Sequence, residues 1–423
     1  MPARVLVLVL AVPSLATAQV VDLVSRNAAG VPGNAASGSA SFSDDGTIIA
    51  FDSLSTNLVA EATTHANVYV RDGSGTITLI TRGLGGVPAN GNSFGPKLSG
   101  DGRVVVFGSL ASNLVTGDTN GAGDIFAYDR ELGTLERVNV DSQEAQSSYV
   151  WGTSSPSHVT RDGRRVVFAS EAADLVPGDT NAVSDVFVRD RLTGETTRLS
   201  TFPNGSQLPW HSWGGLLTPS ERHFVFSTGV ALLPGDFNGA TDVYVRDLVT
   251  GVTQRVSVSS QGVEGNNESV GEDVSADGRF VVFRSHANNL VPGDVNNEED
   301  VFVRDRLLGR TQRVSVSSQG VQANWFSIAP RITDDGRFVY FISYASNLVP
   351  GDTGFDPNLF VRDRLLGTTR RVGFLPPNEW TEFGFALLGN GSRLAFTAAP
   401  VDSSPLRQIY LRIQPAPGPV PVR

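Results

Sequence analysis

Residues Glu272 to Gly320 read EDVSADGRFVVFRSHANNLVPGDVNNEEDVFVRDRLLGRTQRVSVSSQG, and this stretch decides the fold. Short runs of β-branched and aromatic residues alternate in it with turn signals, and no run has a helical period. The runs predict four strands, here called a to d, over residues 272–275, 279–285, 300–304 and 311–317. Gly278 and Gly309 supply the positive φ that tight turns often require. The a–b and c–d connections are therefore predicted to be tight turns, and the b–c and d–a connections to be long loops.

The same unit recurs along the whole chain. Its marker is the Phe near the end of strand b, which is found at Phe51, Phe107, Phe168, Phe226, Phe283, Phe341 and Phe396. A four-stranded unit that is apolar on both faces needs a neighbour on each side, and a closed ring of units supplies both. The sequence therefore predicts an all-β fold, a seven-bladed β-propeller built from four-stranded antiparallel blades.

The two ends of the chain share one blade in this prediction. Residues 20–26, VVDLVSR, match strand d, whereas residues 383–413 supply only strands a, b and c. The N-terminal strand is thus expected to complete the last blade, and residues 19–413 to form a single propeller domain. Residues 414–423 are rich in Pro and are expected to form a disordered tail.

The first residues have the pattern of a signal peptide over residues 1–18. Arg4 precedes an apolar run from Val5 to Leu15, and Ala16-Thr17-Ala18 is the small-x-small pattern of a cleavage site. A transmembrane anchor is the alternative, but the run is shorter than the roughly 20 residues that a bilayer requires. We therefore expect an exported protein, periplasmic or extracellular, that does not span a membrane.

The turn between strands a and b carries a family resemblance. In PRITDDGR, from Pro330 to Arg337, strand a and its Asp-Gly turn resemble the repeat of TolB-type, WD40-like β-propellers. The resemblance covers nearly all of the chain after the signal peptide. It implies an exported bacterial protein that acts by binding other molecules of the cell envelope or the medium.

The composition excludes several classes of function. The chain has 423 residues, of which 33 are Lys or Arg and 43 are Asp or Glu, and its net charge is −10. Nucleic-acid binding is not expected, because the attraction to phosphate needs a basic surface. The absence of Cys excludes disulfide scaffolds, thiolate zinc sites and cysteine nucleophiles. We expect a monomer.

Four b–c loops repeat the pattern Gly-Asp-x-Asn-x-x-x-Asp. Counted from its first Asp, the pattern has Asp, Asn and Asp at positions 1, 3 and 7. Ca²⁺ prefers hard oxygen ligands of this kind, so the loops predict weak calcium sites and no other cofactor. The candidate ligands are Asp118, Asn120, Asp124, Asp179, Asn181, Asp185, Asp236, Asn238, Asp242, Asp294, Asn296 and Asp300. The alternative is that these side chains cap the backbone of their own loops as Asx turns and bind no metal.

The Trp residues form a second candidate site. All five are predicted to lie in d–a loops, on the rim that also carries the b–c loops: Trp151, Trp210, Trp213, Trp325 and Trp380. Trp side chains on such a rim can stack on a sugar or anchor a protein partner. The alternative is a repeated packing role between blades, since three of the five precede the marker Phe of their blades by the same number of residues.

Two further repeated features are interpreted as structural. An Arg-Asp pair such as Arg304-Asp305 ends strand c, and its Asp is expected to cap the c–d turn. An Arg recurs in strand d and is interpreted as protection of the exposed outer edge against aggregation. It is found at Arg137, Arg198, Arg255, Arg313 and Arg371.

No catalytic residues are predicted, because the His residues are scattered over different blades and no G-x-S-x-G elbow occurs. The channel-side positions just before the last apolar residue of strand a include Lys97, His158, Asp273 and Arg331, which could bind a polar ligand or hold water. We therefore expect a binding module whose long loops contact a protein or a glycan. The alternative is a carbohydrate-active enzyme, a lyase or a glycosidase, whose carboxylates converge from different blades.

Overall fold

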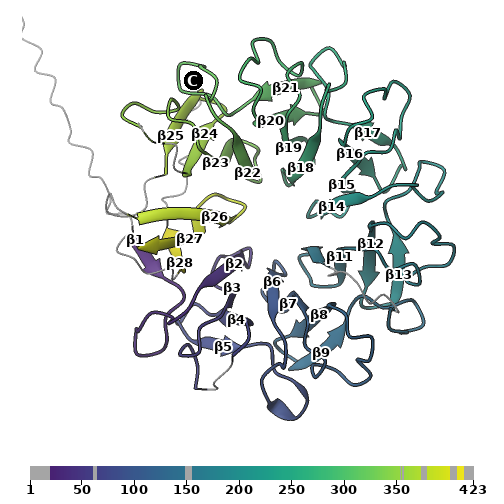
Figure 1. Cartoon of the computed structure of the whole chain (residues 1–423), viewed down its shortest axis with the longest axis vertical. Helices are drawn as coiled ribbons and strands as arrows, with labels where there is room; N and C mark the ends of the chain where they lie inside the picture. Colours follow the sequence, from purple (N-terminus) through teal and green to yellow (C-terminus); the bar gives the residue numbers. More distant parts are fainter. Residues whose placement is uncertain are drawn as a thin grey trace, which may run out of the picture.

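The computed structural model is a ring of seven blades (Figure 1). It describes residues 20–60, 64–147, 155–352, 354, 357–372, 379–400 and 407–413. Each blade is one four-stranded antiparallel sheet, which confirms the predicted seven-bladed β-propeller. The predicted signal peptide and the Pro-rich segment 414–423 lie outside the described residues.

The strands follow one another from the channel outward in each blade. Blades one to three contain β2 (Ser37–Phe42), β3 (Ile49–Ser53), β4 (Asn67–Arg71), β5 (Ile77–Leu79); β6 (Ser93–Leu98), β7 (Val104–Ser109), β8 (Asp124–Asp129), β9 (Thr134–Arg137); and β10 (Ser155–Val159), β11 (Arg165–Ser170), β12 (Asp185–Asp190), β13 (Glu195–Arg198). Blades four and five contain β14 (Ser212–Leu217), β15 (His223–Thr228), β16 (Asp242–Asp247), β17 (Thr253–Arg255); and β18 (Ser269–Val274), β19 (Phe280–Ser285), β20 (Asp300–Asp305), β21 (Arg310–Arg313). Blade six contains β22 (Ser327–Ile332), β23 (Phe338–Ser343), β24 (Asn358–Asp363) and β25 (Thr368–Arg371).

The seventh blade closes the ring with strands from both ends of the chain. It contains β26 (Glu379–Leu387), β27 (Arg393–Pro400), β28 (Gln408–Ile413) and, as its outer strand, β1 (Val20–Leu23). β1 pairs antiparallel with β28, from Val20 opposite Ile413 to Leu23 opposite Tyr410. The predicted closure by the N-terminal strand is therefore confirmed.

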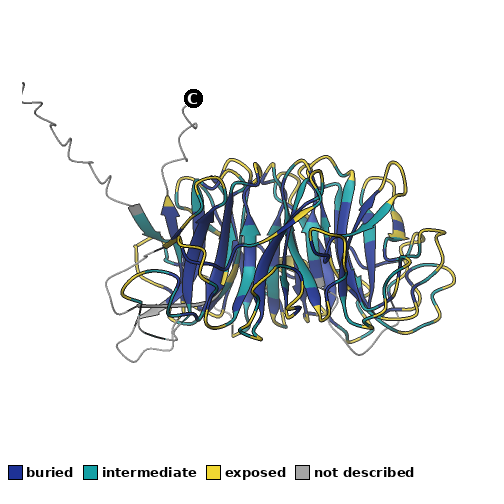
Figure 2. Cartoon of the chain, turned by 90° about the horizontal axis from the view of Figure 1, so that it is seen from above, coloured by how far each residue is buried: buried dark blue, intermediate teal, exposed yellow. Residues whose placement is uncertain are grey.

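The core lies between the blades. In one cluster, Ala50 and Val68 of blade one pack with Val105, Phe107 and Phe126 of blade two, and all five side chains are buried. The other clusters likewise join neighbouring blades, which explains why the middle strands are apolar on both faces. Figure 2 shows the buried middle of the ring between two exposed rims. We call the rim of the b–c and d–a loops the long-loop rim and the opposite one the tight-turn rim.

The inner strands depart from the expected boundaries because every one of them contains an irregularity. In β18 the pairing with β19 shifts between Gly271 and Asp273, and the other six inner strands shift at the equivalent place or, in β2 and β26, just before it. Strand a of this blade therefore begins at Ser269, earlier than expected. Such bulges re-aim the side chains that follow them, here toward the channel. Strand d is shorter than expected, ending at Arg313, because Val316 instead forms a bridge with Gln322 of the following loop.

The described part of the chain contains almost no helix. Its one helical piece is a 3-10 turn, η1 (Leu84–Gly86). No helix among these residues has the length and apolar character needed to cross a membrane.

Candidate functional site

Seven equivalent side chains, one from each blade, form a ring inside the channel. Each follows the bulge of its inner strand and lies opposite the same position of strand b, as Lys97 lies opposite Val106 and Asp273 opposite Val282. The ring consists of Ser41, Lys97, His158, Leu216, Asp273, Arg331 and Ala386. All seven line one cavity of about 380 Å³. The structure thus confirms that the four channel-side residues expected from the sequence converge.

The cavity opens on the tight-turn rim. Residues of the a–b turns also line it, among them Asp44, Gly100, Arg161 and Gly389. Sequence analysis favoured the opposite rim as the working surface because its loops are longer. Loop length does not predict where a channel is wide enough for a ligand, because that width depends on the side chains of the inner strands. The pocket is therefore a site that loop length did not predict.

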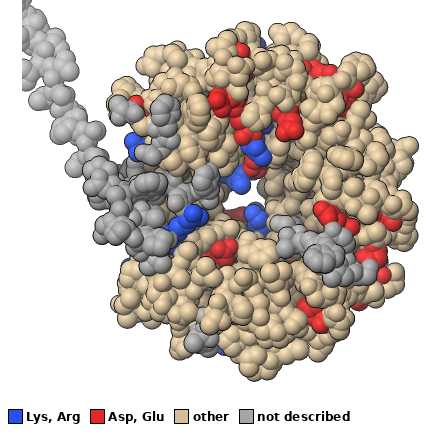
Figure 3. Space-filling view, in the orientation of Figure 1, with Lys and Arg blue, Asp and Glu red and all other residues tan. Residues whose placement is uncertain are grey.

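The acidic side chains of the cavity are already engaged. Glu272 accepts from Arg284 Nε at 2.8 Å through Oε1, and its Oε2 lies 3.3 Å from Arg331 Nη1. The two oxygens of Asp273 accept backbone N–H groups, from Val274 and from Ile332 of the next blade, each at 2.9 Å. Burial nevertheless raises the pKa of Asp273 to about 6, with the charge of Arg331 acting against that rise. Figure 3 shows Lys and Arg atoms beside acidic atoms around the central opening.

The basic side chains on the opposite side of the cavity are not engaged in this way. Lys97 and His158 make no hydrogen bond and no ion pair with the residues that the structure describes. Burial and the positive charge of Arg331 lower the pKa of Lys97 to about 8, with the negative charges of Asp273 and Glu272 acting against that shift. Burial and the charge of Lys97 lower the pKa of His158 to about 4. At neutral pH the imidazole is therefore neutral, and Lys97 is a cation that no described carboxylate contacts directly.

The predicted calcium loops contain a positive side chain. In blade three, Arg198 Nη1 lies 3.3 Å from Asp179 Oδ2 and 3.2 Å from Asp185 Oδ2. Asn181 donates to the carbonyl of Leu208 in the following d–a loop and accepts from Val183 N of its own loop. The same arrangement recurs with Arg137 between Asp118 and Asp124, Arg255 between Asp236 and Asp242, and Arg313 between Asp294 and Asp300, where Asn120, Asn238 and Asn296 cap the backbone.

This arrangement corrects the interpretation of the strand d Arg residues. Four of them do not protect the outer edge of the sheet, because their side chains are about nine-tenths buried and neutralise the loop carboxylates. Arg371 of blade six, where the loop motif is degraded, is exposed. A guanidinium that occupies the space between the carboxylates favours the alternative in which these loops bind no metal. Calcium binding stays a prediction.

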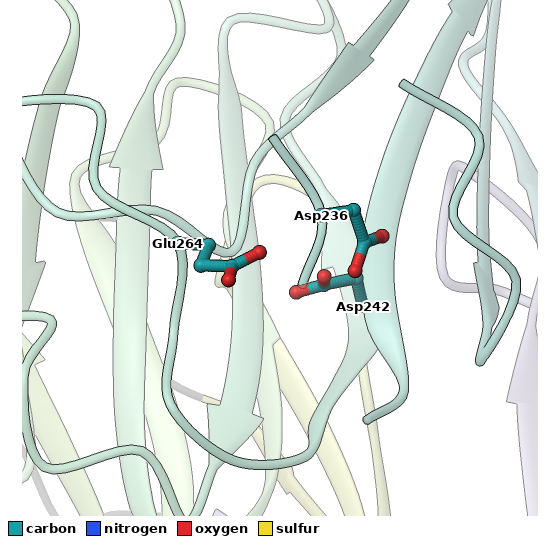
Figure 4. Close-up of side chains that lie close together, drawn as sticks. All are labelled: Asp236, Asp242 and Glu264. Atoms are coloured by element: carbon teal, nitrogen blue, oxygen red, sulfur yellow. The ribbon is translucent and has the colours of Figure 1, made fainter. Parts of the chain in front are cut away.

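Blade four differs from the other three at this site. Its three acidic side chains converge (Figure 4), and their ligand atoms lie within 4.8 Å of one another. Glu264 occupies the place that Gln146, Gln207 and Gln322 occupy in the other blades, and it lies 2.8 Å from Arg255. Those Gln side chains donate to the first Asp of the loop, as Gln322 does to Asp294 at 2.7 Å. In blade four the Tyr244 hydroxyl replaces this donor, at 2.7 Å from Asp236.

We expect the two differences of blade four to be energetically coupled. Tyr244→Phe removes a hydrogen bond to a buried carboxylate and should lower the free energy of unfolding by about 1.5 to 3 kcal/mol. In a Glu264→Gln background the new amide can donate to Asp236, so the same substitution should then cost less than about 1 kcal/mol. Urea unfolding of the four proteins of this cycle measures the coupling. An equal cost of Tyr244→Phe in both backgrounds would contradict the exchange of donors.

The Trp residues lie partly where they were expected. Trp210 and Trp325 lie in d–a loops, but Trp213 lies in β14 and Trp380 in β26, and Trp151 lies outside the described residues. The side chains of Trp210, Trp213 and Trp325 are 58%, 40% and 41% exposed. His211 lies between the first two, with its ring stacked on that of Trp213 at 5.9 Å. The three described Trp side chains are therefore accessible on the long-loop rim and are not buried between blades.

A repeated Asn motif that sequence analysis missed holds this rim in shape. The side chain of Asn324, in the loop after blade five, donates to the Ser346 hydroxyl and accepts the backbone N–H of Ser346. The backbone N–H of Asn324 in turn donates to the side chain of Asn347 in blade six. The same exchange occurs at Asn34, Asn90 and Asn266. The recurring sequence Asn-Leu-Val in the b–c loops, as at Asn347, was the signal for it. Neighbouring blades are thus joined through their loops.

The strand c Arg-Asp pairs have the predicted structural role. Asp305 Oδ1 accepts from the backbone N–H groups of Leu307 and Leu308 in the c–d turn. Its carboxylate also pairs with Arg279 of the a–b turn at 2.7 Å. The Arg279 partner lowers the pKa of Asp305. The tight-turn rim is therefore fixed by charged hydrogen bonds in this blade, and equivalent ones recur around the ring.

Comparisons with known proteins identify the architecture. No protein-family model and no curated protein matches the sequence. The β-propeller domain of the Trilobed protease from Pyrococcus furiosus, described as having an open velcro topology, is 12% identical, with a TM-score of 0.55 over 91% of this chain and 99% of that one. Oligogalacturonate lyase from Vibrio parahaemolyticus is 13% identical, with a TM-score of 0.56 over 94% and 97% of the two chains.

TolB proteins are also among the similar solved structures. TolB from Acinetobacter baumannii is 18% identical, with a TM-score of 0.39 over 66% of this chain and 54% of that one. Likeness at these identities concerns the fold alone. The chain is a seven-bladed β-propeller, closed here by its own N-terminal strand.

Proposed function

We propose that this chain is a non-catalytic binding module whose partner contacts the long-loop rim. The observation that carries the proposal is the exposure of Trp210, Trp213 and Trp325 on that one rim. Aromatic side chains supply large contact areas at low cost in conformational entropy, and they dominate binding energies where they are found in interfaces. The partner that we propose is a protein or a glycan.

The rim is organised in advance of binding. The His211 ring accepts the backbone N–H of Ser184 at 3.0 Å, and its edge packs against Trp210 at 5.6 Å. Near Trp325, the rings of Phe326 and Tyr344 lie 4.2 Å apart. Side chains that are already fixed lose little freedom when a partner binds. This rigidity supports a recognition role for the aromatic groups.

We propose that the partner belongs to the cell envelope or the medium. The support is the N-terminal sequence, in which Arg4, the apolar run and Ala16-Thr17-Ala18 have the order of a signal peptide. The chain after this segment would then act outside the cytoplasm. Its net negative charge makes nucleic acid an unsuitable partner.

A rim variant tests this proposal. Trp210→Ala/Trp213→Ala/Trp325→Ala should weaken binding by about tenfold or more, because each truncated Trp is a hot-spot candidate. The measurement is retention of envelope proteins and of arrayed glycans by residues 20–423. The matched control is Leu307→Ser/Leu308→Ser, which removes exposed apolar side chains from the opposite rim. Equal retention by the wild type and the rim variant would contradict the proposal.

A carbohydrate-active enzyme is the second candidate, and the observation that favours it is the cavity with Lys97, His158 and Asp273. The oligogalacturonate lyase named above has the same fold. Against this candidate, Asp273 and Glu272 are both held by donors, whereas glycosidases need a carboxyl group that can give or take a proton. Release of unsaturated or reducing sugar from acidic polysaccharides by the wild type, and its loss in Lys97→Met, would make the enzyme the better proposal.

A further inference from the structure

We propose that the channel cavity on the tight-turn rim is a binding site for a small organic acid, whose carboxylate is held between Lys97 and Arg331. This site lies at the opposite end of the channel from the aromatic side chains and is independent of them. Its ligand is a monocarboxylate with a polar body.

The position of Lys97 is the first argument. It is the only Lys in the sequence, and the other side chains that are basic at neutral pH are Arg. Its side chain lies in the cavity wall without a partner among the described residues. Buried charges are normally paired, because an unpaired one loses its hydration without compensation. The ammonium group of Lys97 therefore has N–H groups that no described residue accepts.

Arg331 supplies the second half of the site. Its Nη1 donates to the carbonyls of Glu272 and Pro330, at 3.1 and 2.8 Å, which fixes the guanidinium in the wall. Within the described residues, Nε and Nη2 of Arg331 have no acceptor. A fixed guanidinium edge with free N–H groups matches the two oxygens of a carboxylate.

The charges around the cavity favour an anion with one charge. Glu272 and Glu299 share Arg284, and Asp273 is satisfied by two backbone N–H groups. The carboxylates of Asp273 and Glu272 act on Lys97 through their charge but do not contact it, whereas a cation ligand would meet only oxygens that already accept hydrogen bonds. A monocarboxylate adds only one negative charge to a cavity that already holds Glu272 and Asp273, whereas a phosphate dianion adds two.

The size and walls of the cavity limit the ligand. A volume of about 380 Å³ is near the lower end of small-molecule sites. Beside the charged groups, the walls combine the polar Ser41 and the neutral His158 with the apolar Leu216, Leu387 and Ala386. These walls suit a hydroxylated acid of monosaccharide size better than a long acyl chain.

Calorimetry with defined probes tests the site. Gluconate should bind residues 20–423 with heat that saturates, and sorbitol, its uncharged relative, should not bind. Lys97→Met should weaken gluconate binding by about tenfold to a hundredfold, and Lys97→Arg should retain most of it. Arg310→Met removes an exposed charge of β21, outside the cavity, and should change the affinity less than about twofold.

The pH dependence of the wild type is a second measurement, which needs no variant. The groups that face Lys97 across the cavity are Arg331, Glu272, Asp273, His158, Arg161 and Asp44. His158, with its pKa of about 4, and Asp273, with its pKa of about 6, do not change charge above neutral pH. Lys97 does, so gluconate binding should weaken as the pH rises from about 7 to about 9.5, and it should stay constant in Lys97→Arg.

The outcomes separate this site from the alternatives. Equal binding of gluconate by wild type and a folded Lys97→Met, or no binding to the wild type, overturns the proposal. Stronger binding of inorganic phosphate than of gluconate overturns the carboxylate assignment. If Lys97→Met fails to fold, the pH profile of the wild type against that of Lys97→Arg decides. None of these results depends on the Trp side chains, so this proposal and the proposed function fail separately.

Discussion

Replacing Arg198 by Ala should lower the free energy of unfolding by about 3 to 5 kcal/mol, because two buried carboxylates lose their counter-ion. The Arg198 side chain is 10% exposed, and those of Asp179 and Asp185 are 2% and 0% exposed. Ser200 and Gln207 still donate to these carboxylates, but neutral donors do not cancel two charges. Urea unfolding at neutral pH measures the loss.

The repeat supplies a matched control for this prediction. Arg371 occupies the same position of strand d in blade six, where its side chain is exposed and the loop lacks the full motif. Arg371→Ala should change the free energy of unfolding by less than about 0.5 kcal/mol. Equal losses in the two variants would mean that Arg198 acts through the sheet edge, as its position in the sequence suggested, and not through the loop.

The loss in Arg198→Ala should also depend on pH. Burial raises the pKa of Asp185, so the folded protein binds its proton more tightly than the unfolded chain does. A group of this kind destabilises the fold as the pH rises through the interval between its unfolded and folded pKa. Arg198 lowers the pKa of Asp185 in the folded protein, so without Arg198 the interval between the unfolded and folded pKa extends to higher pH. The deficit of Arg198→Ala relative to the wild type should therefore shrink as the pH is lowered from neutral toward acid.

The Arg198→Ala variant also tests whether the loop can bind Ca²⁺. If the guanidinium occupies the place of the predicted metal, added Ca²⁺ should stabilise Arg198→Ala more than the wild type, because the two freed carboxylates can then bind it. A melting temperature of the wild type that falls in EDTA would instead support the calcium sites expected from the sequence. The same experiment thus separates the two interpretations of the loops.

The ring and its closure followed from the sequence, and the role of the strand d Arg did not. The alternation of side chains along a strand predicts which face of the sheet a residue lies on. It does not predict that the b–c loop covers the strand d Arg, because that contact joins residues far apart in the sequence. One signal was present nevertheless. In blade one, which lacks the loop motif, Leu79 occupies the position that Arg137 has in blade two. Loss of both features together indicates that they interact.

The channel residues could be predicted even though the bulges could not. The residues at the bulges have no common type, since Ser157, Gly215 and Glu272 are equivalent. The ring residues lie between the bulge and the a–b turn, at a spacing from the turn that recurs in the repeat. Because this spacing does not include the bulge, the extra residue at the bulge does not change the predicted positions. What alternation along one strand could not show is that Lys97 and Arg331, from blades far apart in sequence, face one cavity.

Removing residues 20–26 should lower the free energy of unfolding by more than about 3 kcal/mol, because the ring then loses the strand that closes it. Val24, fully buried, leaves a core cluster, and Asp22 no longer pairs with Arg71 at 2.7 Å. The Arg71 side chain is 9% exposed, so its charge would stay buried without that partner. Thermal unfolding of residues 27–423 against residues 20–423 measures the effect.

The truncated chain should also associate with strands other than its own. Without β1, the outer edge of β28 presents unpaired backbone N–H and C=O groups, which pair readily with another chain. A peptide of residues 20–32 added in trans should restore the melting temperature, because it can occupy the vacant edge. The same peptide with Val24→Asp should not, since it would bury a carboxylate in an apolar cluster. Restoration by both peptides would show that the side chain of Val24 does not determine closure, and restoration by neither would contradict the expected occupation of the vacant edge.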